Sequence, residues 1–271
     1  MTRTTDALDL IRGEPVEEIP LDPTPLARVV AQVRFAQIGK FQLQNPVVGL
    51  LRSMIADDYP LYEQGFEKEI TVGPAGMIAS DSQNPLWRFK TADEFWIATV
   101  TPSSLALETT RYVSRPDFVE RFTRFVEAFV REVGHSSVSR LGVRYTNFIE
   151  SGTDSEEELV SFFHYELRGP INISKEGVGL RHGLSDMAIQ DGSHGLQGKW
   201  GILPPGALFD PALTPTSKRT ALLDIDSFNE QTMLMTPELT ANEINSLAAA
   251  AYRLFRAVTS DDFIDSYRAD Q

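Results

Sequence analysis

The sequence predicts an α+β fold, in which antiparallel β-meanders carry long helices packed on one face. Three observations lead to this prediction. Short strand-like runs follow one another between residues 66 and 112, and their connections are too short for parallel crossovers. Long amphipathic helices are predicted at 115–133 and 241–258. The order strand, helix, meander, long helix occurs twice along the chain.

The first half begins with residues 1–25, where four prolines and few large apolar side chains predict a flexible acidic leader. Leu26–Phe35 is β-branched and alternating, which predicts a strand. Asn45 and Pro46 are typical of a helix start, and Pro60 ends that helix. The predicted meander has runs at Phe66–Val72, Gly76–Ser80, Leu86–Lys90, Glu94–Thr101 and Leu105–Tyr112, and Gly134 closes the long helix after it.

The second half repeats this order with longer connections. Ser155 and Glu158 have the spacing of a capping box, which predicts a short helix to about Phe163. Thr240 is predicted to cap the last long helix, and Ser260 a short final one. The predicted strands are Val138–Ile149, Leu180–Gln190, Leu196–Leu203 and Thr220–Phe228, with a proline-rich connection from Pro204 to Pro215.

Matching residues support a tandem duplication. Val33-Arg-Phe35 matches Val143-Arg-Tyr145, and Trp87 matches Trp200 at a similar offset. We therefore predict two α+β units, 26–137 and 138–271, that share one continuous sheet. The alternative is one irregular α+β domain.

The charge is strongly negative but uneven. The chain has 38 Asp and Glu against 25 Lys and Arg, a net charge of −13. Residues 1–25, 150–166 and 224–271 carry most of the acidity, and the remainder is slightly basic, with 17 acids against 20 bases. A broad nucleic-acid surface is disfavoured because it needs clustered cations, while a local basic groove stays open.

Other classes are excluded by composition. The chain has no cysteine, so it has no disulfide, thiolate metal site or cysteine nucleophile. It has no run of about 18 apolar residues, and its first residues lack the apolar segment of a signal peptide. We therefore expect a cytoplasmic protein without a membrane span.

Four strand residues form the candidate ligand-binding site: Arg34, Glu108, Arg144 and Asp226. Arg34 and Arg144 occupy matching places in the predicted repeat, and Glu108 corresponds to Asp226. Arginines within strands are uncommon unless they pair or bind something, so these could hold an anion in a cleft between sheet and helices. The alternative is cross-strand pairing of the arginines with Glu69, Glu108 or Asp226.

Two acidic groups have the spacing of metal ligands. Asp224 and Asp226 alternate with apolar residues and would share one face of a strand. Asp261, Asp262 and Asp265 lie on one helical turn, where the favoured interpretation is a helix N-terminus that accommodates acids. The metal ligands, if any, stay unknown. The aromatic residues Trp87, Phe89, Phe95 and Trp96 are expected in the core, unless they form an exposed binding stripe.

The sequence resembles a family of uncharacterised, sporadically distributed bacterial proteins of about 250–270 residues. The similar segments are Pro25–Phe35, Trp87–Phe89, Leu105–Tyr112, Arg140–Asn147 and Leu254–Thr259, which span nearly the whole chain in order. The resemblance brings no activity and no catalytic residues. The sporadic distribution implies an accessory gene, as in defence or toxin–antitoxin-like loci.

We find no catalytic motif, so the segregated acidity predicts a non-enzymatic binding or accessory protein that docks a protein partner. The first alternative is a small-ligand or nucleotide sensor with an anion site. The second is a metal-dependent hydrolase or nuclease that uses Asp224 and Asp226. We predict no cofactor, and a homo-oligomer stays open.

Overall fold

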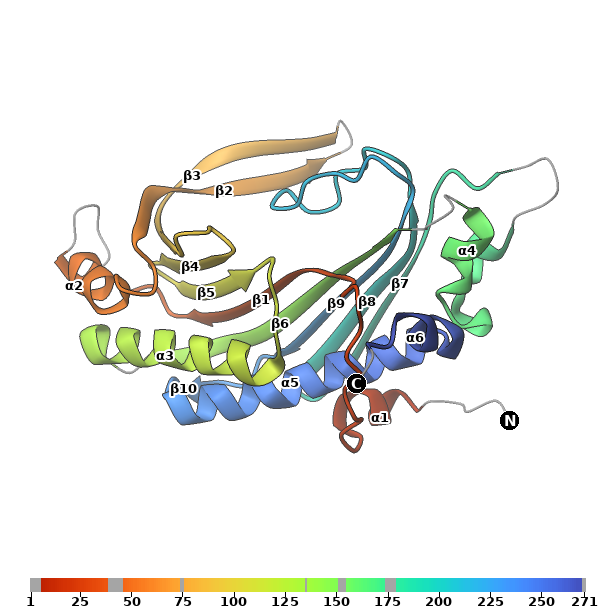
Figure 1. Ribbon diagram of the computed structural model, residues 1–271. Coiled ribbons are helices and arrows are strands. Elements are labelled where there is room, and N and C mark those ends of the chain that lie inside the picture. The colour runs from red at the N-terminus through yellow and green to blue at the C-terminus, as the bar shows by residue number, and fades with distance from the viewer. Residues whose placement is uncertain are drawn as a thin grey trace. The chain divides into compact units, whose positions relative to one another are not determined.

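The computed structural model describes residues 6–38, 46–73, 76–134, 136–150, 155–173 and 179–269. Its strands form an antiparallel sheet in the order β2-β3-β4-β5-β1-β6-β9-β8-β7, and β10 pairs with β6 (Figure 1). The predicted α+β class is therefore confirmed. The duplication stays a prediction.

The chain divides into two compact units, both of which are discontinuous in sequence. Unit 1 comprises residues 1–29, 142–229 and 245–271, and unit 2 comprises residues 30–141 and 230–244. Strands β1 (Leu26–Phe35) and β6 (Ser137–Glu150) and helix α5 (Pro237–Val258) each contribute residues to both units.

Unit 2 packs helix α3 (Arg115–Val133) against its strands. Ser114 caps the helix by accepting a hydrogen bond from the Asp117 amide, and Gly134 ends it at a φ of 96°. The buried face of α3 contacts aromatic side chains of the strands. The ring centroids of Trp96 and Phe118 are 5.8 Å apart. The other elements of unit 2 are α2 (Pro46–Ile55), β2 (Leu61–Gly73), β3 (Gly76–Lys90), β4 (Trp96–Thr101), β5 (Ser104–Thr109) and β10 (Met233–Leu234).

Strand β3 corrects the prediction of two separate runs on either side of Asn84 and Pro85. Pro85 stands opposite Phe66 of β2, beside the register shift between Phe66 and Lys68. On its other side, β3 pairs with β4 only from Trp87 onward. Proline is tolerated at such a position because a bulge needs no ladder hydrogen bond from it.

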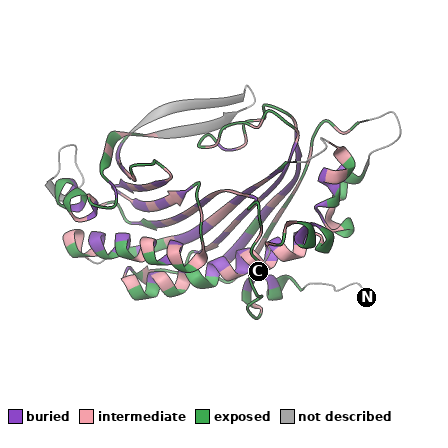
Figure 2. Cartoon of the chain, viewed as in Figure 1, coloured by how far each residue is buried: buried purple, intermediate pink, exposed green. Residues whose placement is uncertain are grey.

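Unit 1 packs the second half of α5 on strands β7 (Gly183–Asp191), β8 (His194–Leu203) and β9 (Thr220–Asn229). Figure 2 shows the buried residues along these strands and the helix. The shared core includes Leu196, Trp200, Leu223, Ile225 and Leu254. Since side chains alternate along a strand, the neighbours of these residues lie on the opposite, helix-free face. The other elements are α1 (Ala7–Arg12), α4 (Glu156–Ser161), α6 (Asp261–Tyr267) and 3₁₀ turns at Tyr165–Leu167 and Gly169–Ile173.

The leader differs from the prediction of a flexible segment, because part of it forms a helix that contacts α5. Residues 7–12 form helix α1, with Asp6 as its N-cap and Leu10 and Ile11 buried. The guanidinium of Arg253 on α5 donates to the carbonyls of Leu10 and Ile11, at 3.0 and 2.6 Å. The helix is only six residues long, which is too short for a periodic apolar signal in a polar segment.

Helix α5 begins earlier than predicted. Thr236 accepts a hydrogen bond from the Leu239 amide at 3.2 Å, and Pro237 is the first helical residue. Thr240, the predicted cap, is buried within the first turns of the helix. A proline at the first helical position is favourable because its missing amide proton would have no partner there.

Candidate functional site

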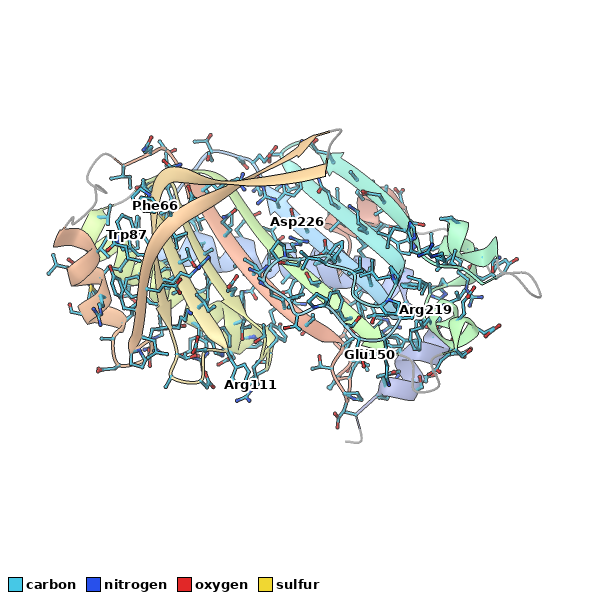
Figure 3. The ribbon with its side chains drawn as sticks, turned by 90° about the horizontal axis from the view of Figure 1, so that it is seen from above. Phe66, Trp87, Arg111, Glu150, Arg219 and Asp226 are labelled. Atoms are coloured by element: carbon cyan, nitrogen blue, oxygen red, sulfur yellow. The ribbon has the colours of Figure 1, made fainter. Side chains whose placement is uncertain are left out.

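On the helix-free face of the strands of unit 1, charged side chains gather around the carboxylate of Asp224. Its Oδ1 atom accepts hydrogen bonds from Arg144 Nε and Thr146 Oγ1, both at 2.8 Å. Arg144 and Thr146 alternate along β6, and Asp224 lies on the neighbouring strand β9, so the three side chains share one face. Figure 3 looks down on this face, on which Asp226 is labelled.

A second carboxylate comes from the connection between β8 and β9. Asp210 is only 5% exposed, and its Oδ2 atom accepts a hydrogen bond from Arg28 at 2.8 Å. Its Oδ1 atom accepts from the Ala212 amide at 2.9 Å, which folds the connection into a turn. Asp210 Oδ2 also lies 3.9 Å from an Arg144 nitrogen. The carboxylate therefore ties the proline-rich connection to β1 and β6.

The cations of this network are already neutralised. Burial by itself would lower the pKa of Arg144, but the hydrogen bond to Asp224 and the charges of Asp224, Asp210 and Asp226 raise it above its usual value. With Arg28, the network holds two cations and three carboxylates. An added anion would have to displace these carboxylates, so the geometry favours pairing over anion binding for Arg144, although its hydrogen-bond acceptor is Asp224, which was not among the predicted partners.

The four candidate ligand-binding residues are divided between the units. Arg144 and Asp226 lie in unit 1, whereas Arg34 and Glu108 lie in unit 2. Arg34 is exposed on β1 and donates to the side chain of Gln32 at 3.0 Å, and Glu108 is half-buried opposite Ile97. The proposed four-residue anion site stays a prediction. The side chain of Glu69, a candidate partner for the arginines, lies outside the described residues.

The alternative of a metal site finds no support among the described residues, which contain no group of three or more acidic or histidine side chains that could hold an ion. Asp224 is bound to Arg144 instead. The three aspartates of α6 follow the N-cap Ser260, whose hydroxyl accepts from the Phe263 amide at 3.2 Å. This is the predicted capping arrangement.

The aromatic cluster belongs to the core of unit 2. Trp87, Phe89 and Trp96 are buried, and the guanidinium of Arg111 covers the ring of Phe95 at 3.7 Å from its centroid. These side chains therefore offer no aromatic docking stripe.

An acidic surface is formed where α4 and α6 meet. The hydroxyl of Ser260 donates to the Ser161 carbonyl at 2.7 Å, and the Ser260 amide donates to the Phe162 carbonyl at 2.9 Å. Phe162 and Phe263 pack beneath, 5.2 Å apart between ring centroids. We define the acidic surface as the carboxylates that these two helices carry outward: Glu157, Glu158, Asp261, Asp262 and Asp265.

Four of these carboxylates are exposed, and that of Glu158 is half-buried. The hydrogen bond from Ser155 lowers the pKa of Glu157. The side chains of Asp261 and Asp265 are 80% and 72% exposed, although Arg256 and Arg268 lie within 3.6 and 3.2 Å of them. Burial raises the pKa of Tyr267 on α6, and the charge of Glu158 on α4 adds to this effect. The two helices thus share one electrostatic environment.

The fold concentrates the acidity of the sequence in unit 1. Unit 1 contains 22 Asp and Glu against 13 Lys and Arg, a net charge of −9, and unit 2 contains 16 against 12, a net charge of −4. The leader also runs beside α6, because the Asp22 amide donates to the Tyr267 carbonyl at 2.8 Å. All three acidic segments therefore contribute to the same unit.

Sequence reasoning missed Asp210, whose carboxylate lies beside Arg144, and Arg28, the second cation that Asp210 binds. Asp210 lies in a proline-rich connection, where no periodicity indicates which strand it meets. A scan against models of known protein families found no match, and neither did a search of curated proteins. None of the described helices is long and apolar enough to cross a membrane.

Proposed function

We propose that the chain is a non-enzymatic accessory protein of the cytoplasm that docks a basic protein partner through the acidic surface of α4 and α6. The observation that carries this proposal is the joining of two acidic segments that lie about a hundred residues apart. Hydrogen bonds from Ser260 to Ser161 and Phe162 hold the two helices together. A preformed surface of one charge accelerates and orients the encounter with a partner of the opposite charge.

The charged network around Asp224 is less suited to docking a partner than the acidic surface is, and this contrast also supports the proposal. Its carboxylates and guanidinium groups satisfy one another, as expected of groups that stabilise a fold. The acidic surface has fewer cations than carboxylates, and the side chains of Asp261 and Asp265 are mostly exposed to solvent. As part of the proposal, the partner is encoded in the same accessory locus, since the similar family is sporadically distributed.

The proposal is tested by affinity capture from the native host with two variants of equal net charge. One variant reverses the acidic surface with Glu157→Lys, Asp262→Lys and Asp265→Lys. The control reverses three exposed acids of unit 2 with Asp57→Lys, Glu120→Lys and Glu230→Lys. We expect the natural chain and the control to retain one basic protein that the first variant loses.

Salt provides an independent readout of the same interaction. A contact made by exposed charges weakens as the Debye length falls from about 10 Å at 0.1 M to about 3 Å at 1 M salt. The retained protein should therefore elute as salt rises. Retention of the same proteins by all three chains would overturn the proposal.

A further inference from the structure

Unit 2 contains a pocket of about 160 Å³ between the end of α2 and the middle of α3. The two helices pack against each other (Figure 1). Met54 and Ile55 contribute apolar atoms from α2, and Phe125 and Ala128 contribute them from α3. A cavity of roughly 150 Å³ is enough to hold a benzene ring. The pocket therefore has room for a small ligand with an apolar body.

Three guanidinium groups line the same pocket, together with the carboxylates of Asp58 and Glu127. Arg121, Arg124 and Arg131 follow one face of α3, at spacings that place them side by side along the helix. Each is held by one carboxylate, at 3.0 Å for Arg121 and Asp117, 2.6 Å for Arg124 and Asp58, and 2.9 Å for Arg131 and Glu127. Such exposed pairs contribute at most about 1 kcal/mol, so their donors can turn to a ligand at little cost.

The pocket also contains a buried hydroxyl whose proton has no acceptor. Tyr59 is only 6% exposed, and among the described residues no acceptor lies within hydrogen-bond distance of its hydroxyl. Arg121 lies close enough to act as a donor to the hydroxyl oxygen. The charged neighbours of Tyr59 are Arg121, Asp58 and Arg124. A guanidinium cannot accept a hydrogen bond, and the Asp58 carboxylate lies outside hydrogen-bond distance of the hydroxyl, so the hydroxyl proton lacks an acceptor.

The hydroxyl of Tyr59 keeps its proton and can therefore donate a hydrogen bond. Burial raises the pKa of Tyr59 above its usual value, against the opposing effect of Arg121. The group is therefore protonated at neutral pH. A buried donor without an acceptor costs free energy in the unbound protein, and a ligand oxygen that accepts its proton recovers that cost.

We propose that this pocket binds a small organic oxyanion, with its charged oxygens toward Tyr59 and the α3 arginines and its apolar body against Phe125 and Ala128. A carboxylate and a phosphate ester share this chemistry. The site lies in unit 2 and does not depend on the acidic surface of unit 1. The charge-reversed variant of α4 and α6 should therefore bind the same ligands as the natural chain.

Calorimetric titration of the full chain tests the proposal with benzoate, phenyl phosphate and benzyl alcohol. We expect the anions to bind and the neutral alcohol to bind at least about tenfold more weakly, because charge-assisted hydrogen bonds are the stronger ones. The tighter of the two anions identifies the head group. Failure of both anions to bind, or equal binding of the alcohol, would overturn the proposal.

Substitutions in the pocket distinguish ligand binding at this site from binding elsewhere on the chain. Tyr59→Phe removes a hydroxyl whose proton has no acceptor in the protein, so it should weaken anion binding about tenfold with little change in the melting temperature. Ala128→Leu should abolish binding because its side chain fills the pocket, and Arg124→Gln serves if that variant does not fold. Arg115→Gln, at the start of the same helix and outside the pocket, is the matched control and should bind normally. Unchanged affinity in both Tyr59→Phe and Arg124→Gln would contradict the site.

Discussion

Arg144 on β6 and Asp224 on β9 form a side-chain ion pair, with 2.8 Å between Nε and Oδ1. Asp224 is the more buried partner, and its Oδ1 also accepts from Thr146. The pair joins two neighbouring strands on the helix-free face of unit 1. It makes Arg144 part of the fold rather than a free cation.

The Arg144–Asp224 pair predicts that removing the Asp224 carboxylate lowers the stability of the fold. Asp224→Asn should lower the free energy of unfolding by about 1–3 kcal/mol, because the half-buried guanidinium loses a charged acceptor. Urea denaturation measures this change. The matched control is Asp186→Asn, which removes an exposed acid 3.3 Å from Lys199 and should change stability by less than about 1 kcal/mol. Equal losses in the free energy of unfolding would show that the Arg144–Asp224 pair contributes no more than an exposed ion pair.

Asp210 predicts a local effect on the connection from β8 to β9. Asp210→Ala removes the acceptor of both Arg28 and the Ala212 amide, so the connection should detach from the strands. Hydrogen exchange should become faster at Gly206 and Leu213, whose amides donate within this connection. Lys218→Ala, an exposed change in the same connection, should leave their exchange unchanged. Persistent protection in Asp210→Ala would contradict the anchoring role.

The hydrogen bonds of Arg253 are expected to protect helix α1 from proteolysis. Arg253→Met removes the donors to the Leu10 and Ile11 carbonyls while keeping an unbranched apolar side chain. We expect trypsin to cleave at Arg12 several times faster in this variant than in the natural chain. Arg268→Met, whose side chain pairs only with exposed Asp265 in the described contacts, serves as the control. Cleavage at an unchanged rate would mean that other contacts hold α1.

The Glu63–Lys90 pair predicts a pH dependence in unit 2. The hydrogen bond from Lys90 is the main cause that lowers the pKa of Glu63. Since the carboxylate is favoured in the folded state, its contribution is present above its ordinary pKa of 4.5 and is lost as pH falls through the lowered folded pKa. The hydrogen bond to Glu63 raises the pKa of Lys90, so that contribution is present below 10.5 and is lost only at higher pH.

Glu63→Gln isolates this contribution. At pH 7 the natural chain should be more stable than the variant by up to about 1 kcal/mol, since the pair is exposed. The difference should vanish as the pH falls well below 4.5, as measured by urea denaturation at several pH values. A difference that persists in acid would assign the effect to packing instead of charge.

Much of the fold could be predicted because its signals are local. The amphipathic face of α3 and its end at Gly134 follow from spacing and from one glycine. The two runs around Pro85 were wrong as separate strands, because the bulge beside Phe66 that tolerates the proline depends on the partner strand. Helix α1 was missed because its docking depends on Arg253, far along the chain.

The candidate site was harder to predict for the same reason. The sequence grouped Arg144 and Asp226 in one candidate site, but it did not indicate that Asp210 would reach this network from a proline-rich connection. It separated the acidic segments correctly, yet only the fold brings Ser161 and Ser260 into contact and joins two of them. Partners that are distant in sequence leave no periodic signal.

Site-specific photo-crosslinking in the native host tests the docking of a basic partner by the acidic surface most directly. A photoreactive amino acid replaces Ser266, an exposed residue of α6 beside Asp265, or Glu120, an exposed residue of α3 in unit 2. We expect one basic protein to be crosslinked from position 266 and not from position 120. Equal crosslinking from both positions, or none from position 266, would contradict the account.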